Sequence, residues 1–113
     1  MKPRIEVHDS GDNVFADLGL PNAEAHFLKA QVVAELYRLV KERCLTQTKA
    51  GILMGVSQPE VSRLFKGNFR EYSVDRLMAF LTAFDRYVEI VSRPRIAASE
   101  GNKGTIRFKP AAE

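Results

Sequence analysis

The chain has 113 residues, of which 45% are hydrophobic, and a net charge of +3, which suits one small buried core but hardly two. It has no apolar run of roughly 18 residues and no apolar signal core near Met1, so we expect a cytoplasmic protein with no membrane partner. Its single cysteine cannot form an internal disulfide, which fits a reducing compartment.

Residues 1–22 are predicted to form an N-terminal arm. The arm is acidic in balance, yet its apolar residues lie close together at Val14, Phe15, Leu18 and Leu20. Such a segment is expected to dock rather than float, either on a partner or as a lid on the helix that follows.

A long helix is predicted from Ala23 to about Arg43, with Asn22 as its cap. Apolar residues recur along it on two adjacent stripes, which predicts a buried scaffold helix. One stripe is Leu28, Val32, Leu36 and Leu39, and the other is Val33, Tyr37, Val40 and Cys44. Cys44 is therefore expected to be a buried thiol at the helix end.

Two short helices joined by a glycine turn are predicted within residues 45–67. Thr46 can cap the first helix, which should end at Met54. Gly55 can then adopt the left-handed conformation that a sharp turn needs. This arrangement is typical of a helix-turn-helix.

The second short helix has three start signals. Ser57 and Glu60 match an S-x-x-E capping box, and Pro59 falls in the first turn, where its missing N–H is not felt. A small residue at Gly51 should let the two helices cross closely. The residues expected to face inward are Ala50, Leu53, Val56, Val61 and Leu64.

The polar face of the second helix consists of residue types that read a DNA groove, Gln58, Pro59, Ser62, Arg63 and Lys66. Glutamine can contact adenine, arginine can contact guanine or phosphate, and a proline ring can pack on a thymine methyl. Residues 31–70 also hold seven Lys and Arg against three Asp and Glu. A plain helical hairpin with a solvated polar face is the alternative interpretation.

After the helix-turn-helix, the loop at residues 67–72 offers Asn68 and Arg70 to phosphates, while Phe69 and Tyr72 are expected to pack. Ser73 can then cap a helix from Val74 to Phe84 that closes the core, with Leu77, Met78, Phe80, Leu81 and Phe84 facing inward.

The remainder of the chain, residues 86–113, is predicted to be a β segment. Tyr87–Val91 and Thr105–Lys109 are β-prone, so they can form a short strand or hairpin, and pairing with a second subunit would stabilise it. A disordered tail beyond Ser99 is the alternative. Together these elements predict a mainly α fold, with an arm at 1–22 and a DNA-binding domain at 23–85.

Residues 45–67, LTQTKAGILMGVSQPEVSRLFKG, resemble the XRE, or Cro/lambda-repressor-like, helix-turn-helix without a gap. The family typically has a glycine where this chain has Cys44, an acid at Lys49 and an alanine at Gly51. The resemblance implies a five-helix lambda-repressor-like domain in which Gln47 binds a phosphate and braces the second helix.

The same resemblance implies that the polar face of the second helix contacts base edges and that Lys66 and Asn68 lie near phosphates. With the two helix caps and the loop arginine added, the expected DNA-binding set is Thr46, Gln47, Ser57, Gln58, Pro59, Ser62, Arg63, Lys66, Asn68 and Arg70.

Two flanking segments narrow the resemblance. NVFADLGLP at residues 13–21 and LTAFDRYVEIV at residues 81–91 are similar to small HigA-type antitoxins, which are partners of RelE/HigB-like toxins. The resemblance implies a dimeric repressor that binds an operator in double-stranded DNA, neutralises a toxin and represses its own operon. A free-standing regulator without a toxin, and a toxin-binding module that no longer binds DNA, remain alternatives.

An enzyme is not expected. His8 and His26 are far apart, there is one thiol, and no metal-ligand spacing, phosphate-cradling glycine loop or nucleophile motif is present. We therefore expect no metal and no cofactor.

Overall fold

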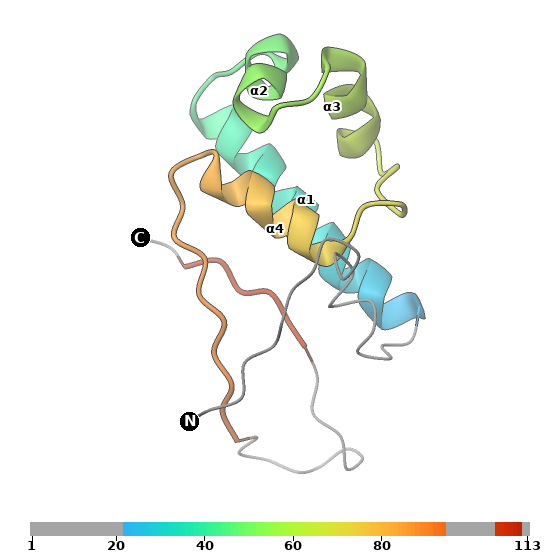
Figure 1. Cartoon of the computed structure of the whole chain (residues 1–113), viewed down its shortest axis with the longest axis vertical. Coiled ribbons are helices and arrows are strands. Elements are labelled where there is room, and N and C mark those ends of the chain that lie inside the picture. The colour runs from blue at the N-terminus through green and yellow to red at the C-terminus, as the bar shows by residue number, and fades with distance from the viewer. Residues whose placement is uncertain (1–21, 95–105, 112–113) are drawn as a thin grey trace, which may run out of the picture.

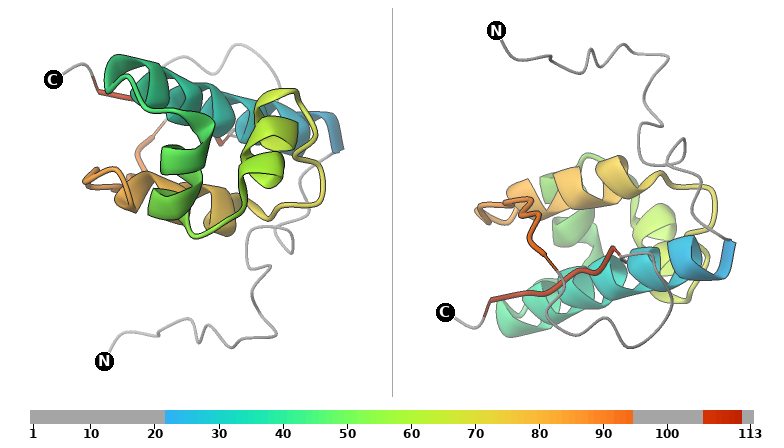
Figure 2. Two further views of the ribbon diagram at one scale, coloured as in Figure 1. Left: turned by 90° about the horizontal axis from the view of Figure 1, so that it is seen from above. Right: turned by 90° about the horizontal axis from the view of Figure 1, so that it is seen from below.

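The computed structural model of the chain describes residues 22–94 and 106–111 and consists there of four helices and extended loops (Figure 1). The helices are α1 (Asn22–Glu42), α2 (Gln47–Met54), α3 (Gln58–Phe65) and α4 (Val74–Thr82). α1 packs against α4, and α2 and α3 lie together across one side of this pair (Figure 2). The mainly helical fold is confirmed, but with four helices in the described residues rather than five. Of the arm predicted at residues 1–22, residues 1–21 lie outside them, and Asn22 belongs to α1.

The helix starts follow from hydroxyl caps, as expected. The side-chain oxygens of Thr46, Ser57 and Ser73 accept hydrogen bonds from the backbone N–H groups three residues later, at 3.1, 3.2 and 3.2 Å. Each cap therefore satisfies one of the N–H groups that a helix start leaves without a partner. Asn22 is the first residue of α1 rather than a cap before it.

One apolar core joins all four helices. Its largest fully buried side chains are Phe84, Leu36, Leu39, Leu64, Leu77, Leu81, Val32 and Val61. The main predicted stripe of α1 is confirmed, but Tyr37 on the second stripe is 47% exposed and contacts the Phe65 ring edge-on at 5.3 Å. α1 is therefore the scaffold on which α3 rests.

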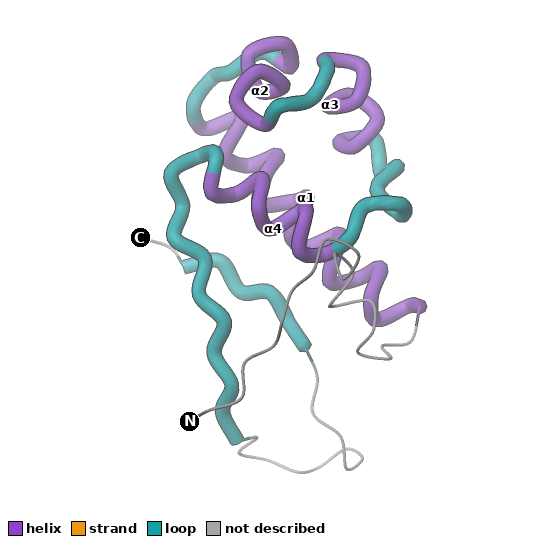
Figure 3. Tube along the Cα trace, in the orientation of Figure 1, coloured by secondary structure: helices purple, strands orange, loops and turns teal. Residues whose placement is uncertain are grey.

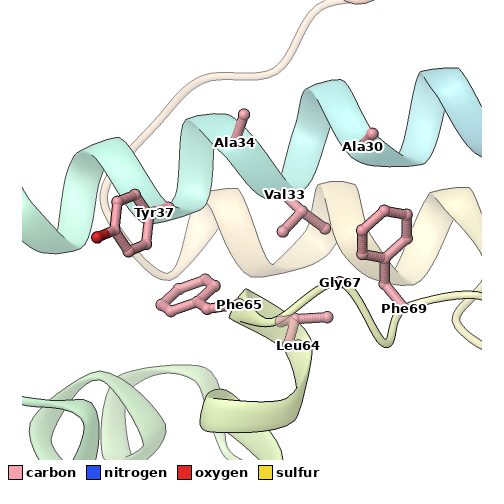
Figure 4. Close-up of a pocket in the computed structure, with 8 residues that line it drawn as sticks. All are labelled: Ala30, Val33, Ala34, Tyr37, Leu64, Phe65, Gly67 and Phe69. Carbon is pink, nitrogen blue, oxygen red and sulfur yellow. The ribbon is translucent and has the colours of Figure 1, made fainter.

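An open apolar hollow of about 340 Å³ lies where α1 meets the C-terminal end of α3. Figure 4 shows Ala34 and Tyr37 on α1 and Leu64 and Phe65 on α3 bordering it. Phe69, a buried residue of the loop between α3 and α4, also lines it. The packing between α1 and the C-terminal end of α3 is therefore open to solvent on this side.

The end of α1 corrects the expectation of a buried Cys44 thiol. Cys44 is exposed and has a φ of 54°. Its N–H donates to the Lys41 carbonyl at 3.1 Å, and the Leu45 N–H donates to the Val40 carbonyl at 3.0 Å. This is a Schellman motif, in which the left-handed residue lies past the helix and points outward rather than along the buried stripe. The helix-turn-helix family that residues 45–67 resemble typically has glycine at this position, and a positive φ favours glycine.

Replacing Cys44 with glycine should raise the free energy of unfolding by about 1 kcal/mol. A left-handed conformation costs a residue with a Cβ roughly 1–2 kcal/mol, and the larger conformational entropy of glycine in the unfolded chain offsets part of that gain. Urea denaturation followed by circular dichroism measures the difference. Cys44→Ser is the matched control, because it removes the thiol but keeps the Cβ. An equal gain in both variants would contradict the backbone argument.

Residues 86–94 and 106–111 contain no strand (Figure 3). The β segment predicted after α4 is therefore wrong for these described residues. Residues 106–111 lie along α1 (Figure 2), where the Gln31 side chain bonds both backbone groups of Phe108, with Nε2 to the carbonyl at 3.3 Å and the N–H to Oε1 at 3.4 Å. A glutamine amide thus takes the hydrogen bonds that a neighbouring strand would supply. Thr105, the first residue of the second predicted run, lies outside the described residues.

Candidate nucleic-acid interface

The turn between α2 and α3 depends on two glycines. Gly55 has a φ of 79° and ends α2, and its N–H and that of Val56 both donate to the Gly51 carbonyl at 2.7 and 2.9 Å. A Cβ on Gly51 would lie 2.6 Å from the Val56 carbonyl oxygen. The predicted close approach is confirmed, because the α2–α3 turn runs directly over the Gly51 backbone.

The inward face of α2 differs from the prediction at one residue. Ala50, Gly51 and Met54 are buried, whereas Leu53 is 43% exposed. On so short a helix the buried stripe follows the i to i+4 direction from Ala50 to Met54, so Leu53 lies beside the stripe.

α3 presents one buried and one polar face. Val61 and Leu64 are buried, while the predicted groove-reading residues lie on the outside: Gln58, Pro59, Arg63 and Lys66 are exposed and Ser62 is half-buried. The cap residues Thr46 and Ser57 are exposed at the starts of α2 and α3. An eight-residue helix with this division can lie in a major groove with its outer side chains toward the base edges.

A side-chain hydrogen bond joins the starts of the two helices. The Gln58 amide nitrogen donates to the Gln47 side-chain oxygen at 2.7 Å. A glutamine amide has two N–H donors and one oxygen, so both donors on the Gln47 nitrogen remain available to a phosphate oxygen. The Gln58 oxygen also remains available to a base. The bond therefore holds the two glutamine amides, both predicted to contact DNA, in a fixed relation.

The loop after α3 continues the polar surface. Asn68 and Arg70 are exposed, and the backbone between them is fixed because Phe69 is buried and stacks on the His26 ring at 4.9 Å. Lys29 on α1 donates to the Arg70 carbonyl at 2.9 Å. Partial burial, with a smaller effect from the charge on Arg70, lowers the pKa of Lys29. The expected packing of Phe69 is confirmed.

A polar hollow of about 630 Å³ borders α3 and this loop. Arg63, Asn68 and Arg70, all predicted from the sequence, line it together with Arg76 from α4. Lys66, the C-cap of α3, is outside that lining. The candidate residues thus form two neighbouring groups, one at the starts of α2 and α3 and one around the end of α3.

Lys29 and Arg76 are basic residues at this surface that the sequence analysis did not identify. Both lie on helices outside the helix-turn-helix segment, and only the packing of α1 and α4 brings them to the α3 loop. No local pattern in the sequence marks them. Only the tertiary contacts place these two residues at the candidate interface.

Within residues 22–94 and 106–111, no group of three or more His, Cys, Asp or Glu side chains is arranged to hold a metal ion. None of the helices described there is long and apolar enough to cross a bilayer.

Comparisons with known proteins agree on the type of domain. A family model described as a helix-turn-helix domain matches residues 14–93. The chain is also similar to a solved structure that bears the name of an XRE-family transcriptional regulator, with 31% sequence identity and a TM-score of 0.69 over 82% of this chain and 100% of that one. No curated protein matches the sequence.

Proposed function

The chain belongs to the XRE family of helix-turn-helix proteins, and on this premise we propose that it is a sequence-specific DNA-binding transcriptional repressor. The observation that carries the proposal is the exposed polar face of α3, braced at its start by the hydrogen bond from Gln58 to Gln47. Side chains with this donor and acceptor pattern match base edges in the major groove. A solvated surface helix has no need of such a brace.

The individual roles follow from position. Gln58, Pro59, Ser62 and Arg63 read base edges. Thr46, Gln47 and Ser57 contact phosphates at the starts of α2 and α3, where backbone N–H groups and the helix dipole favour an anion. Lys66, Asn68 and Arg70 contact phosphates beyond the end of α3.

The proposal is tested by titrating the protein against labelled DNA from the region upstream of its own reading frame and against shuffled DNA of the same composition. Specific binding should exceed binding to the shuffled DNA by at least about a thousandfold. Affinity should fall as salt rises, with a log–log slope of about −0.9 for each phosphate contacted. Equal affinity for both DNAs would reject a sequence-specific repressor.

Dimerisation is part of the proposal, because α3 is only about 12 Å long and reads few base pairs. Proteins of this architecture usually place two such helices on half-sites about 34 Å apart. The proposed contact is Tyr87–Val91, where Tyr87, Ile90 and Val91 are 88%, 71% and 64% exposed. Pairing with the same segment of a second copy would complete the strand that one chain alone does not form.

Ile90→Asp should therefore weaken self-association about tenfold without unfolding the chain, because Ile90 is largely exposed and its loss leaves the monomer core intact. Sedimentation or light scattering across micromolar concentrations measures the change. Ser92→Asp adds the same charge at a neighbouring exposed polar residue and is the control. A parent protein that stays monomeric both free and on DNA would rule out the dimer.

We further propose that the repressor is the antitoxin of a toxin–antitoxin pair. Support comes from the similarity of residues 13–21 and 81–91 to HigA-type antitoxins and from the acidic balance of the arm, which suits a basic RelE/HigB-like toxin. Co-expression with the adjacent reading frame tests this, with copurification and loss of toxicity expected. A neighbour that is harmless and does not bind would favour a free-standing regulator. Deleting residues 1–21 from a complex that forms then shows whether the arm contributes to toxin affinity or only to stability.

A further inference from the structure

A polar cluster lies on the side of α3 that faces α4. The Tyr72 hydroxyl donates a hydrogen bond to Glu60 Oε2. Arg76 Nη2 lies 3.9 Å from the same oxygen. We call Glu60, Tyr72 and Arg76 the Glu60 cluster. It joins the first turn of α3, the loop after it and α4, three elements that meet only in the folded chain.

The Glu60 carboxylate is the unexpected member. In a full capping box it would bond the backbone N–H of Ser57, but here only the Ser57 half of the box is formed, at 3.2 Å. The carboxylate turns toward Tyr72 and Arg76 instead. Its side chain is 28% exposed, so α3 keeps an acid in its DNA-facing first turn but directs it toward the protein.

The other two members, Tyr72 and Arg76, are held in place by packing on Phe80. The Arg76 guanidinium lies over the rings of Tyr72 and Phe80, at 5.0 and 5.5 Å from their centroids. Tyr72 meets Phe80 edge-on at 6.0 Å, and Phe80 is buried in the core. Burial, and then the bond to Glu60, raises the pKa of Tyr72 to about 12. The hydroxyl therefore keeps its proton, and remains a donor, at neutral pH.

We propose that Glu60, Tyr72 and Arg76 are positioning residues that set the angle of α3 in the DNA groove and hold the Glu60 carboxylate away from the phosphates. The Gln47–Gln58 bond fixes α3 from the α2 side. The Glu60 cluster fixes it from the α4 side, two residues further along the same helix. The inference rests on the proposed DNA-binding function and adds residues that touch no DNA to its specificity.

The test uses Tyr72→Phe, which removes only the hydroxyl and keeps the ring on Phe80. Operator affinity should fall roughly five- to tenfold, since members of one hydrogen-bond network couple by that order. The loss should be smaller on shuffled DNA, because a tilted α3 loses base contacts first. The slope of log affinity against log salt should stay unchanged, because no phosphate contact is removed. Tyr37→Phe is the matched control and should bind as the parent does, because it removes a tyrosine hydroxyl from a 47% exposed side chain and keeps the ring on Phe65.

A second pair of variants separates the bond from the charge. Glu60→Gln keeps an acceptor for Tyr72 and should bind within about twofold of the parent. Glu60→Ala should lose as much as Tyr72→Phe, and the double variant with Tyr72→Phe should lose no more than either single one. If Tyr72→Phe proves partly unfolded at the assay temperature, Glu60→Ala, which leaves the Tyr72–Phe80 packing in place, decides the result.

The outcomes distinguish a failure of the positioning role from a failure of the proposed DNA-binding function. A parent protein with no preference for its operator overturns the proposed function, and the positioning role with it. A parent that binds its operator while Tyr72→Phe and Glu60→Ala bind equally tightly overturns only the positioning role. A salt slope that becomes shallower by about 0.9 in Tyr72→Phe would show a direct phosphate contact instead.

Discussion

Arg63→Ala should weaken operator binding by about 1–3 kcal/mol and relax the preference at one base position. Arg63 is exposed on the outer face of α3, opposite the buried Val61 and Leu64. It also lines the polar hollow beside Asn68 and Arg70. A guanidinium so placed can bond the O6 and N7 atoms of guanine together, and alanine leaves both without a partner.

Titrations against a set of operators with single base changes measure both parts of this expectation. Gln47→Ala is the matched comparison, because Gln47 is expected to bind a phosphate and brace Gln58. It should weaken binding to all the operators by a similar factor and leave the base preferences nearly intact. An equal loss on every sequence for Arg63→Ala would show that Arg63 contacts only phosphate. A loss confined to one base for Gln47→Ala would contradict the phosphate role.

Elements that depend on neighbours in the sequence could be predicted from the sequence. The caps Thr46, Ser57 and Ser73 bond N–H groups three residues away, so their signal is contained in a few consecutive residues. The buried stripes of α1 and α4 follow the 3.6-residue period in the same way. The family resemblance then supplied the candidate DNA-binding set, which remains a prediction residue by residue.

Features that depend on tertiary packing were missed. Glu60 matches a capping box in the sequence, but a hydroxyl and a guanidinium from distant segments compete for its carboxylate. Lys29 reaches the interface only because α1 passes the α3 loop. Cys44 was missed for a local reason instead. It continues an apolar stripe in the sequence, but the Schellman turn, made by backbone hydrogen bonds within residues 40–45, ends the helix before that position.

The C-terminal segment shows the same limit. Its β-prone run at Tyr87–Val91 predicts a strand, but a strand requires a partner with free backbone groups on an aligned edge. In residues 106–111 a side chain takes the place of such an edge, because Gln31 bonds both backbone groups of Phe108. β propensity thus identifies a segment that is able to pair, but it does not specify the partner strand.

Gly51→Ala should lower the free energy of unfolding by about 1–2 kcal/mol, although alanine is the better helix former and is common at this position in the related family. Alanine would gain about 1 kcal/mol in helix propensity. Its Cβ, however, would lie 2.6 Å from the Val56 carbonyl oxygen and 3.4 Å from Val61 Cγ2. A backbone oxygen cannot rotate away as a side chain can, and overpacking of this kind costs roughly 1–3 kcal/mol or more.

The same substitution should also lower operator affinity. The clash can be relieved only if α2 moves away from the α2–α3 turn. That movement would stretch the bond between Gln47 and Gln58, which is 2.7 Å long here, so operator affinity of the folded fraction should fall together with stability. Thermal unfolding and operator titration of the same sample measure the two effects. Ile52→Ala is the matched control, since Ile52 is 75% exposed on the same helix and should be neutral or slightly stabilising. A Gly51→Ala protein at least as stable as the parent, with unchanged operator affinity, would show that the turn yields without moving α3.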